Sequence, residues 1–240
     1  MRLFLPFIAA ATLGACTVET AQTPTTEPAP KTTTPAVTKK SQSPKLSSRT
    51  AVANYRAVVR QVEPVAEREC RARAPDLNCD FKIVVDERPN LPPNAFQTLD
   101  NNGRPILGFT ISLIADARNR DEIAFVMGHE AAHHIARHLA KQQQTAVGGA
   151  ILGGIIAASV GLDVNAGQQL GGTVGARAYS KENELEADAL GTLIAKKAGF
   201  NPVLGAQFFN RIPDPGDKFL GTHPPNAQRI ETVRRVNSQL

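Results

Sequence analysis

One five-residue motif constrains this chain more than any other feature of its sequence. It consists of His129, Glu130, two alanines and His133. In an α-helix, positions four apart lie on one face about 40° from each other, so both imidazoles can reach a single ion. Glu130 is rotated by about 100° from the first histidine, which places its carboxylate beside the ion rather than on it. The motif therefore predicts a helical metal site with an acid–base group next to it.

The residues around the motif are typical of a long helix. Asn119 and Glu122 stand three apart, as in a capping box, and predict a helix over residues 119–144. On a continuous helix, His138 lies half a turn out of phase with the first histidine of the motif. We therefore interpret His138, and also His134, as structural residues rather than ligands.

Acidic residues on a second predicted helix, residues 179–197, offer a further ligand. Catalytic zinc usually has three protein ligands, and Glu184 is the candidate for the third, beside the two histidines. Asp188 lies one turn further on, where it could hydrogen-bond a ligating histidine and fix its tautomer. These residues predict one Zn²⁺ per chain. Such a zinc lowers the pKa of a bound water to about 7, and Glu130 can accept its proton.

The segment before the motif predicts a helix and three strands. Apolar residues at helical spacing, with arginines opposite, favour a helix over residues 51–73, which Pro64 should kink or divide. Residues 81–85 form a short β-branched run. The segments 95–99 and 105–110 flank an Asp-Asn-Asn-Gly turn signal. We expect a single strand followed by a hairpin.

Both acidic and histidine motifs resemble those of a known family. The stretch from Glu184 to Asp188 reads Glu-Leu-Glu-Ala-Asp and, together with the HExxH sequence, is similar to the motifs of HtpX and BepA type zinc metallopeptidases. These are membrane-associated or periplasmic enzymes of the gluzincin group. The resemblance covers about residues 94–229 and implies Glu184, not Glu186, as the third ligand. It also implies an α+β zincin-like fold, with a small, mostly antiparallel sheet packed on the HExxH helix and additional helices.

The resemblance implies a zinc metalloendopeptidase that hydrolyses unfolded or misassembled proteins for quality control in the bacterial cell envelope. An alternative of another class is a zinc-containing chaperone or assembly factor with latent or no proteolysis, which would have envelope assembly machinery as partner. The formal net charge is only +5, without a dense Lys/Arg stripe, which argues against a nucleic-acid partner. The expected partners are polypeptides.

Two further segments match the same family. Asn94, Ala95 and Phe96 resemble its edge strand beside the metal, to which an extended substrate can add by backbone hydrogen bonds. His223 stands in a Thr-His-Pro-Pro turn, with Arg229 six residues later, and matches a motif whose histidine lies near the zinc. Two roles stay open for His223: catalysis by stabilising the oxyanion, or blocking the metal in a resting state. A histidine that merely stands in a rigid proline turn is a third interpretation.

The N-terminal part of the chain cannot build a core and has the composition of a leader and a tether. Residues 3–13 are apolar and are followed by Gly-Ala-Cys, which resembles a bacterial lipobox. We therefore predict a lipoprotein signal peptide over residues 1–15, in preference to an ordinary cleaved signal, with Cys16 as the lipidated residue. Residues 16–50 predict a disordered Pro/Thr/Ser-rich tether with a contour on the order of 100 Å. Residues 51–240 remain for the metallopeptidase domain.

The cysteines fit an oxidising compartment. With Cys16 assigned to lipid, Cys70 and Cys79 form an even pair, which we predict to be bridged, with a contribution of about 2 to 4 kcal/mol. Thr17 follows the lipobox in place of an aspartate, which by resemblance to enterobacterial lipoproteins favours the outer membrane. The expected location is the cell envelope, lipid-anchored at the outer membrane and facing the periplasm.

Residues 146–162 are apolar, glycine-rich and uncharged. Their length approaches that of a membrane span, while the glycine spacing also suits close packing against the catalytic helix. We favour a packed or lid-like element, and an integral membrane peptidase in which this segment inserts is the alternative.

Overall fold

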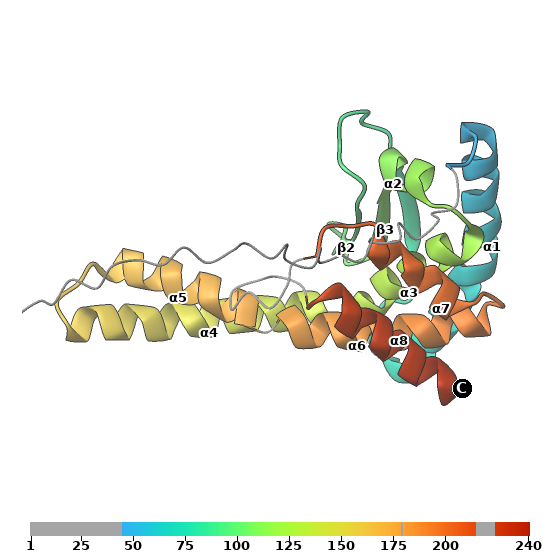
Figure 1. The fold of residues 1–240 in the computed structure, drawn as a ribbon. Helices are drawn as coiled ribbons and strands as arrows, with labels where there is room; N and C mark the ends of the chain where they lie inside the picture. The colour runs from blue at the N-terminus through green and yellow to red at the C-terminus, as the bar shows by residue number, and fades with distance from the viewer. Residues whose placement is uncertain (1–44, 179, 215–223) are drawn as a thin grey trace, which may run out of the picture. The chain divides into compact units, whose positions relative to one another are not determined.

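The computed structural model describes residues 45–178, 180–214 and 224–240 of the chain, drawn as the coloured ribbon in Figure 1. These residues belong to one compact unit, Gln42–Leu240. Several predicted features lie outside the described residues: the signal peptide, Cys16, most of the tether, Tyr179 and His223.

Three strands form a small mixed sheet in the order β1-β3-β2. β2 (Ala95–Leu99) and β3 (Pro105–Thr110) form the predicted antiparallel hairpin. β1 (Lys82–Asp86) pairs with the other side of β3 and runs parallel to it. The expectation of a mostly antiparallel sheet was therefore wrong for one of the two pairings. A tight turn forces β2 and β3 to run antiparallel, whereas β1 reaches β3 only after the connection 87–94 and the whole of β2.

The first helix and the sheet enclose the core with the HExxH helix. α1 (Ser48–Arg73), α2 (Ile111–Asp116) and α3 (Arg120–Ile135) all contribute to it. The largest fully buried side chains include Val58, Val62, Phe81, Leu107, Phe109 and Phe125. Of the two expected effects of Pro64, a kink or a division, the division does not occur, since α1 continues through this residue. Proline lacks a backbone N–H, so the helix loses one hydrogen bond, the one to the carbonyl of Arg60. Arg60 is exposed, so water can bond to this carbonyl instead.

The HExxH helix begins as predicted but ends earlier. The Asn119 side chain accepts a hydrogen bond from the Glu122 backbone N–H at 2.9 Å and caps α3. Arg137 then has a left-handed backbone, with φ of 60°, and interrupts the helix. α4 (His138–Ser159) starts immediately afterwards. The predicted single helix over residues 119–144 is thus two helices with a break between them.

Residues 146–162 pack in a different place from the one expected. Most of this segment belongs to α4, which pairs with a helix that the sequence reasoning did not foresee, α5 (Val164–Ala178) (Figure 1). A Cβ on Gly153 would lie 2.1 Å from the carbonyl oxygen of Gly167, so the two backbones are in contact. The glycines therefore serve the α4–α5 pair and not the catalytic helix. No helix among the described residues has the length and apolar character needed to cross a membrane.

The C-terminal half supplies the second helix of the site and the helices that support it. α6 (Ser180–Lys197) packs on α3, and α8 (Asn226–Ser238) packs on α6 (Figure 1). α6 is followed, as predicted, by a glycine, Gly199, whose φ of 87° suits the left-handed turn that ends a helix. A short α7 (Pro202–Gly205) and a 3₁₀ helix, η1 (Ala206–Asn210), lie between α6 and α8.

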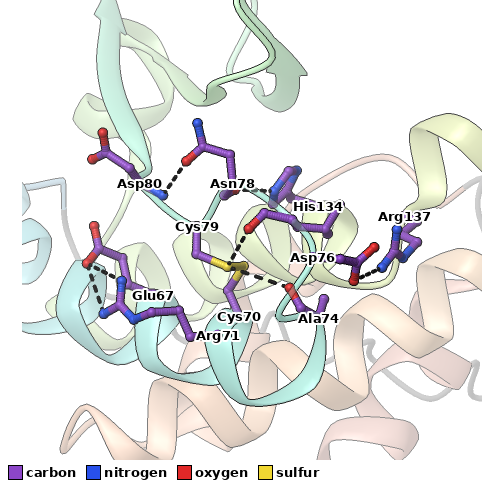
Figure 2. The surroundings of a disulfide bond; sticks show 11 residues. Glu67, Cys70, Arg71, Ala74, Asp76, Asn78, Cys79, Asp80, His134 and Arg137 are labelled. Carbon is purple, nitrogen blue, oxygen red and sulfur yellow. Dashed lines mark hydrogen bonds and ion pairs between the residues drawn. A yellow bond between two sulfur atoms is a disulfide. The ribbon is translucent and has the colours of Figure 1, made fainter.

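A disulfide joins Cys70 at the end of α1 to Cys79 (Figure 2). The loop that it closes docks on the end of α3, where a ring nitrogen of His134 lies 2.8 Å from the carbonyl oxygen of Asn78 (Figure 2). The predicted structural role of His134 agrees with this contact. The disulfide therefore restrains the loop on which the C-terminal end of the HExxH helix rests.

Candidate active site

Side chains from two helices converge on one point. α3 supplies His129 and His133, and α6 supplies Glu184. The Nε2 atoms of the two histidines lie 2.9 Å apart. The Glu184 carboxylate oxygens lie 3.5 Å from His129 Nε2 and 3.4 Å from His133 Nε2. Ligand atoms of all three residues lie within 4.8 Å of one another.

This donor set fits a tetrahedral cation. Zinc bonds of about 2.0–2.2 Å to nitrogen and oxygen place neighbouring ligand atoms of a tetrahedron about 3.3 Å apart, close to the separations of these three side chains. Two imidazole nitrogens that face each other need a proton or a cation between them. Imidazole ligands suit zinc and related transition metals better than calcium or magnesium. His129, His133 and Glu184 would therefore hold one such ion, with the three protein ligands that catalytic zinc sites have.

Two glycines allow the second helix to approach the first. A Cβ on Gly191 of α6 would lie 2.8 Å from the backbone nitrogen of His129. A Cβ on Gly128 of α3 would lie 2.8 Å from the carbonyl oxygen of Gly191. The helix backbones thus touch beside the first ligand, and a side chain at either position would separate them. This contact brings Glu184, which lies about two turns before Gly191, within reach of the histidines.

Asp188 and Arg229 hold the first ligand in place. Asp188 Oδ1 lies 2.9 Å from His129 Nδ1. Because a carboxylate accepts, Nδ1 carries a proton, so Nε2 is the nitrogen that would bind the ion, in place of a proton of its own. Arg229 of α8 donates from Nε and a terminal nitrogen to both oxygens of Asp188, at 2.8 and 2.7 Å. Its guanidinium carbon lies 4.0 Å from the centroid of the Phe209 ring.

The second ligand has a partner that the sequence reasoning missed. The break at Arg137 turns His138 back toward the site, so that its Nδ1 lies 2.9 Å from His133 Nδ1. His138 Nε2 in turn lies 3.1 Å from a carboxylate oxygen of Glu186, which also accepts from Lys141 at 3.3 Å. The half-turn phase difference applied only to an unbroken helix. His138, which was interpreted as structural, and Glu186, which was set aside as a ligand, therefore orient His133.

Removing this support is expected to weaken the metal site. His138→Asn shortens the side chain, so His133 loses the contact to its Nδ1, and we expect metal affinity to fall by about 10- to 100-fold. The measurement is competition for zinc against a chromophoric chelator. His134→Asn is the matched variant, because it removes a neighbouring buried histidine that contacts no ligand. Unchanged affinity in His138→Asn, or an equal loss in both variants, would contradict the assigned role.

Burial and nearby charges set the protonation of these groups. Burial lowers the pKa of His129, but hydrogen bonds to Asp188 and Glu184 outweigh burial and raise it to about 9. Burial, followed by the neighbouring His129, lowers the pKa of His133 to about 3. Burial opposes the ionisation of Asp188, yet Arg229 holds the pKa of this carboxyl below its usual range. Asp188 therefore stays a carboxylate, the form that anchors His129, and His133 stays neutral, the form that binds a cation.

Glu130 lies where two hollows meet. The residue is 8% exposed and lines both of them, as do His133 and Glu184. The larger hollow encloses about 530 Å³, and its walls are mainly apolar. The apolar walls include Leu113, Phe125, Val126, Phe208, Phe209 and Ile212. The smaller hollow, of about 180 Å³, is mainly polar. The polar walls include Gln97, His138, Gln142 and Asn183.

The free edge of β2 runs past this junction. Among the described strands, β2 has β3 as its single partner. The Thr110 N–H donates to the Asn94 carbonyl at 3.0 Å, so the alternation of an antiparallel pair points the backbone of Asn94 and Phe96 toward β3 and that of Ala95 and Gln97 toward the free edge. Ala95 lines the larger hollow and Gln97 the smaller one. The backbone groups available to an added strand are therefore those of Ala95 and Gln97.

The arrangement defines a class of protein. Two histidines one helical turn apart, a glutamate from a second helix and a buried carboxylate beside them make a metal-dependent hydrolase site of the zincin type. The family model for peptidase family M48 matches residues 53–237. The chain belongs to this family and is a metallopeptidase. The matched range runs from α1 to α8 and includes the small sheet, in agreement with a zincin-like α+β fold. A search of curated proteins finds no match to the chain.

Proposed function

We propose that the protein is a zinc-dependent endopeptidase that cleaves extended segments of unfolded or misassembled proteins. The observation that carries this proposal is the course of the β2 edge past the convergent ligands and Glu130. A polypeptide that pairs with Ala95 and Gln97 through its backbone would bring a peptide carbonyl to the metal centre. Because such pairing reads the backbone and requires an extended chain, unfolded segments are the natural substrates.

Each residue of the site has a separate role in the proposed reaction. When bound, zinc polarises the scissile carbonyl and makes a water acidic enough to lose its proton near neutral pH. Glu130 accepts that proton as the water oxygen bonds to the carbonyl carbon. It then returns the proton to the amine nitrogen as the C–N bond breaks. Asp188 and His138 keep the two ligand rings in fixed orientations throughout.

The larger hollow favours a large apolar side chain beside the cleaved bond. Val126 lies on α3, one turn before Glu130, and forms part of the hollow's wall. Apolar pockets of this kind discriminate by size, because each added methylene contributes only about 1 to 3 kcal/mol. The preference should therefore be broad, for leucine- or phenylalanine-like residues rather than for one sequence.

Filling the hollow is expected to shift this preference. Val126→Phe should lower kcat/KM by about tenfold or more for peptides with leucine or phenylalanine next to the cleaved bond, while alanine peptides change little. Cleavage of a matched peptide pair measures the shift. Val52→Phe, at an exposed apolar position on α1, should leave both rates unchanged. An equal loss on both peptides in Val126→Phe would show that the hollow does not select side chains.

The proposed activity is tested by metal analysis and by digestion of an unfolded protein such as casein. We expect one zinc per chain, cleavage of casein, loss of cleavage after chelation and its return with added zinc. Zinc binding without cleavage, together with tight binding of casein, would favour the chaperone or assembly factor instead. A chain that binds no metal would contradict the proposal.

We propose further that the enzyme acts in the bacterial cell envelope, lipid-anchored through Cys16 at the outer membrane. The lipobox-like sequence supports this location, and so does the disulfide between Cys70 and Cys79, because such bonds persist in oxidising compartments. Incorporation of labelled palmitate by the wild type, and its absence in Cys16→Ala, is the expected result. Equal labelling of both proteins, or of neither, would exclude this anchor.

A further inference from the structure

The helix pair α4–α5 is held together by backbone contact. A Cβ on Gly171 would lie 2.1 Å from the carbonyl oxygen of Gly149, and a Cβ on Gly153 would lie 2.1 Å from that of Gly167. No larger side chain fits between the two helices at these positions. Small residues at such a seam let helices approach closely, and they leave the larger side chains to point outward.

The outward side chains of α4 are large, apolar and exposed. Seven residues between 147 and 162, five on α4 and two just after its end, are each at least 56% exposed. They are Val147, Ile151, Leu152, Ile155, Ile156, Val160 and Leu162. Val147, Ile151 and Ile155 recur every four residues on the side of the helix opposite the glycine seam. Isolated exposed apolar residues are ordinary on protein surfaces, but a contiguous patch of this kind marks an interaction surface.

The outer faces of the two helices differ in polarity. No charged residue occurs between Lys141 and Asp163. On α5, the positions opposite the seam are the exposed polar residues Asn165, Gln169 and Thr173. The pair is therefore amphipathic, with an apolar side formed by α4 and a more polar side on α5, although α5 also exposes Leu170 and contains Arg177.

A lipid surface fits this face better than a protein does. Protein interfaces carry hydrogen bonds and a polar rim. Between residues 146 and 160, the only polar side chain is Ser159, whose hydroxyl already donates to the Ile156 carbonyl at 2.8 Å. A bilayer needs no such groups, because burial of apolar area alone drives the binding. The tether, with a contour on the order of 100 Å from the expected lipid on Cys16, would also keep a membrane within reach.

We propose that the protein docks on lipid bilayers through the outward half of α4, which lies in the plane of the bilayer surface while α5 faces water. Asp163, between the two helices, accepts a hydrogen bond from the Ala166 N–H at 2.7 Å. A carboxylate at this tip opposes insertion of the pair end-on, whereas an in-plane orientation leaves Asp163 at the interface. The amphipathic distribution requires the same orientation, since end-on insertion would bury the polar side of α5.

The kind of lipid follows from the absence of charge. The net charge of +5 would by itself favour adsorption to anionic lipids, weakened by salt. The α4 face has no charged residue between Lys141 and Asp163, so docking through it should depend on neither anionic lipid nor salt. Binding to neutral phosphatidylcholine at high salt therefore separates the proposed docking from adsorption by net charge.

The chain contains no tryptophan, which permits a single optical probe. Leu152→Trp places the probe on the proposed face, and Val52→Trp places a control on an exposed apolar position of α1. The full chain is reconstituted with phosphatidylcholine vesicles whose acyl chains are brominated. We expect quenching of the probe at residue 152 to be at least about twofold greater than at residue 52, because an in-plane helix buries its apolar face about 5–10 Å deep. Adding phosphatidylglycerol or salt should leave this ratio unchanged.

Each other outcome overturns the proposal. Equal quenching at both positions, or none at residue 152, would show that α4 does not enter lipid. A blue-shifted emission at residue 152 that grows with protein concentration, without quenching by bromine, would assign the face to a second copy of the chain.

A second variant tests the assigned face itself. Ile151→Ser with Ile155→Ser, made in the Leu152→Trp chain, should reduce quenching while the zinc content stays unchanged. Undiminished quenching would contradict the assigned face. None of these measurements requires peptidase activity, so they test membrane docking independently of the proposed function.

Discussion

Replacing Glu130 with glutamine is expected to lower kcat for peptide cleavage by about 10²- to 10⁴-fold, the typical contribution of a positioned acid–base group. Glutamine keeps the size and hydrogen-bonding capacity of the side chain but can neither accept the water proton nor return it to the amine. The zinc content should not change, because His129, His133 and Glu184 are untouched. Initial rates on a fluorogenic peptide, with zinc measured on the same sample, check both parts of this expectation.

A matched carboxylate variant makes the result specific. Glu186→Gln alters a glutamate on α6 that contacts His138 but does not line either hollow. Its effect on kcat at saturating zinc should be small. If Glu130→Gln retained most of its activity, the base would have to be another group. If it lost zinc, Glu130 would belong to the ligand set instead.

Replacing Arg229 with methionine is expected to destabilise the protein by about 3 to 5 kcal/mol, because it leaves a buried carboxylate without its partner. Asp188 is 0% exposed, and Arg229 binds both of its oxygens while one of its terminal nitrogens also lies 3.4 Å from Glu184. Methionine can fill the space over the Phe209 ring but offers no charge. Urea unfolding of the chelator-treated protein measures the change in the free energy of unfolding.

Two further variants test whether loss of the ion pair between Asp188 and Arg229, rather than mutation of α8 in general, causes the destabilisation. Arg234→Met changes an exposed arginine on the same helix, α8, and should cost less than about 0.5 kcal/mol. In Asp188→Leu with Arg229→Met, both charges are removed, and such replacements recover much of the stability that a single loss forfeits. If Arg229→Met were as stable as Arg234→Met, the buried ion pair would not be what holds α8 against the site.

Much of the site was predictable because the relevant interactions are local. The spacing of His129 and His133 places them on one helical face, and Asn119 caps that helix through its own next turn. The hairpin followed from its turn residues and from the flanking apolar runs. Glu184 was reached by combining the number of ligands that zinc requires with a family resemblance, and the structure brings it to the two histidines.

The predictions that were wrong concerned how elements continue and pair. A left-handed residue at Arg137 divides the predicted helix, and nothing in the local sequence, such as a glycine or proline, signals that break. His138 is accordingly not among the ligands, as predicted, but the break brings it against His133, a contact that the phase argument did not foresee. The parallel pairing of β1, and the choice of α5 rather than α3 as partner for α4, likewise depend on where distant segments pack.

By itself, the sequence determined that His129 and His133 share one helical face and where their helix begins, since a spacing of four residues and a cap act within one or two turns. Asp188 was also predicted as a support for a ligating histidine, but only the tertiary structure decided the further supports, Arg229, His138 and Glu186. Arg229 reaches the neighbourhood of His129 across 100 residues of chain, and Glu186 reaches His138 across 48. The same is true of the route of β2 past Glu130. Such contacts arise from the packing of whole helices and strands, and their partners cannot be read from the spacing of residues along the chain.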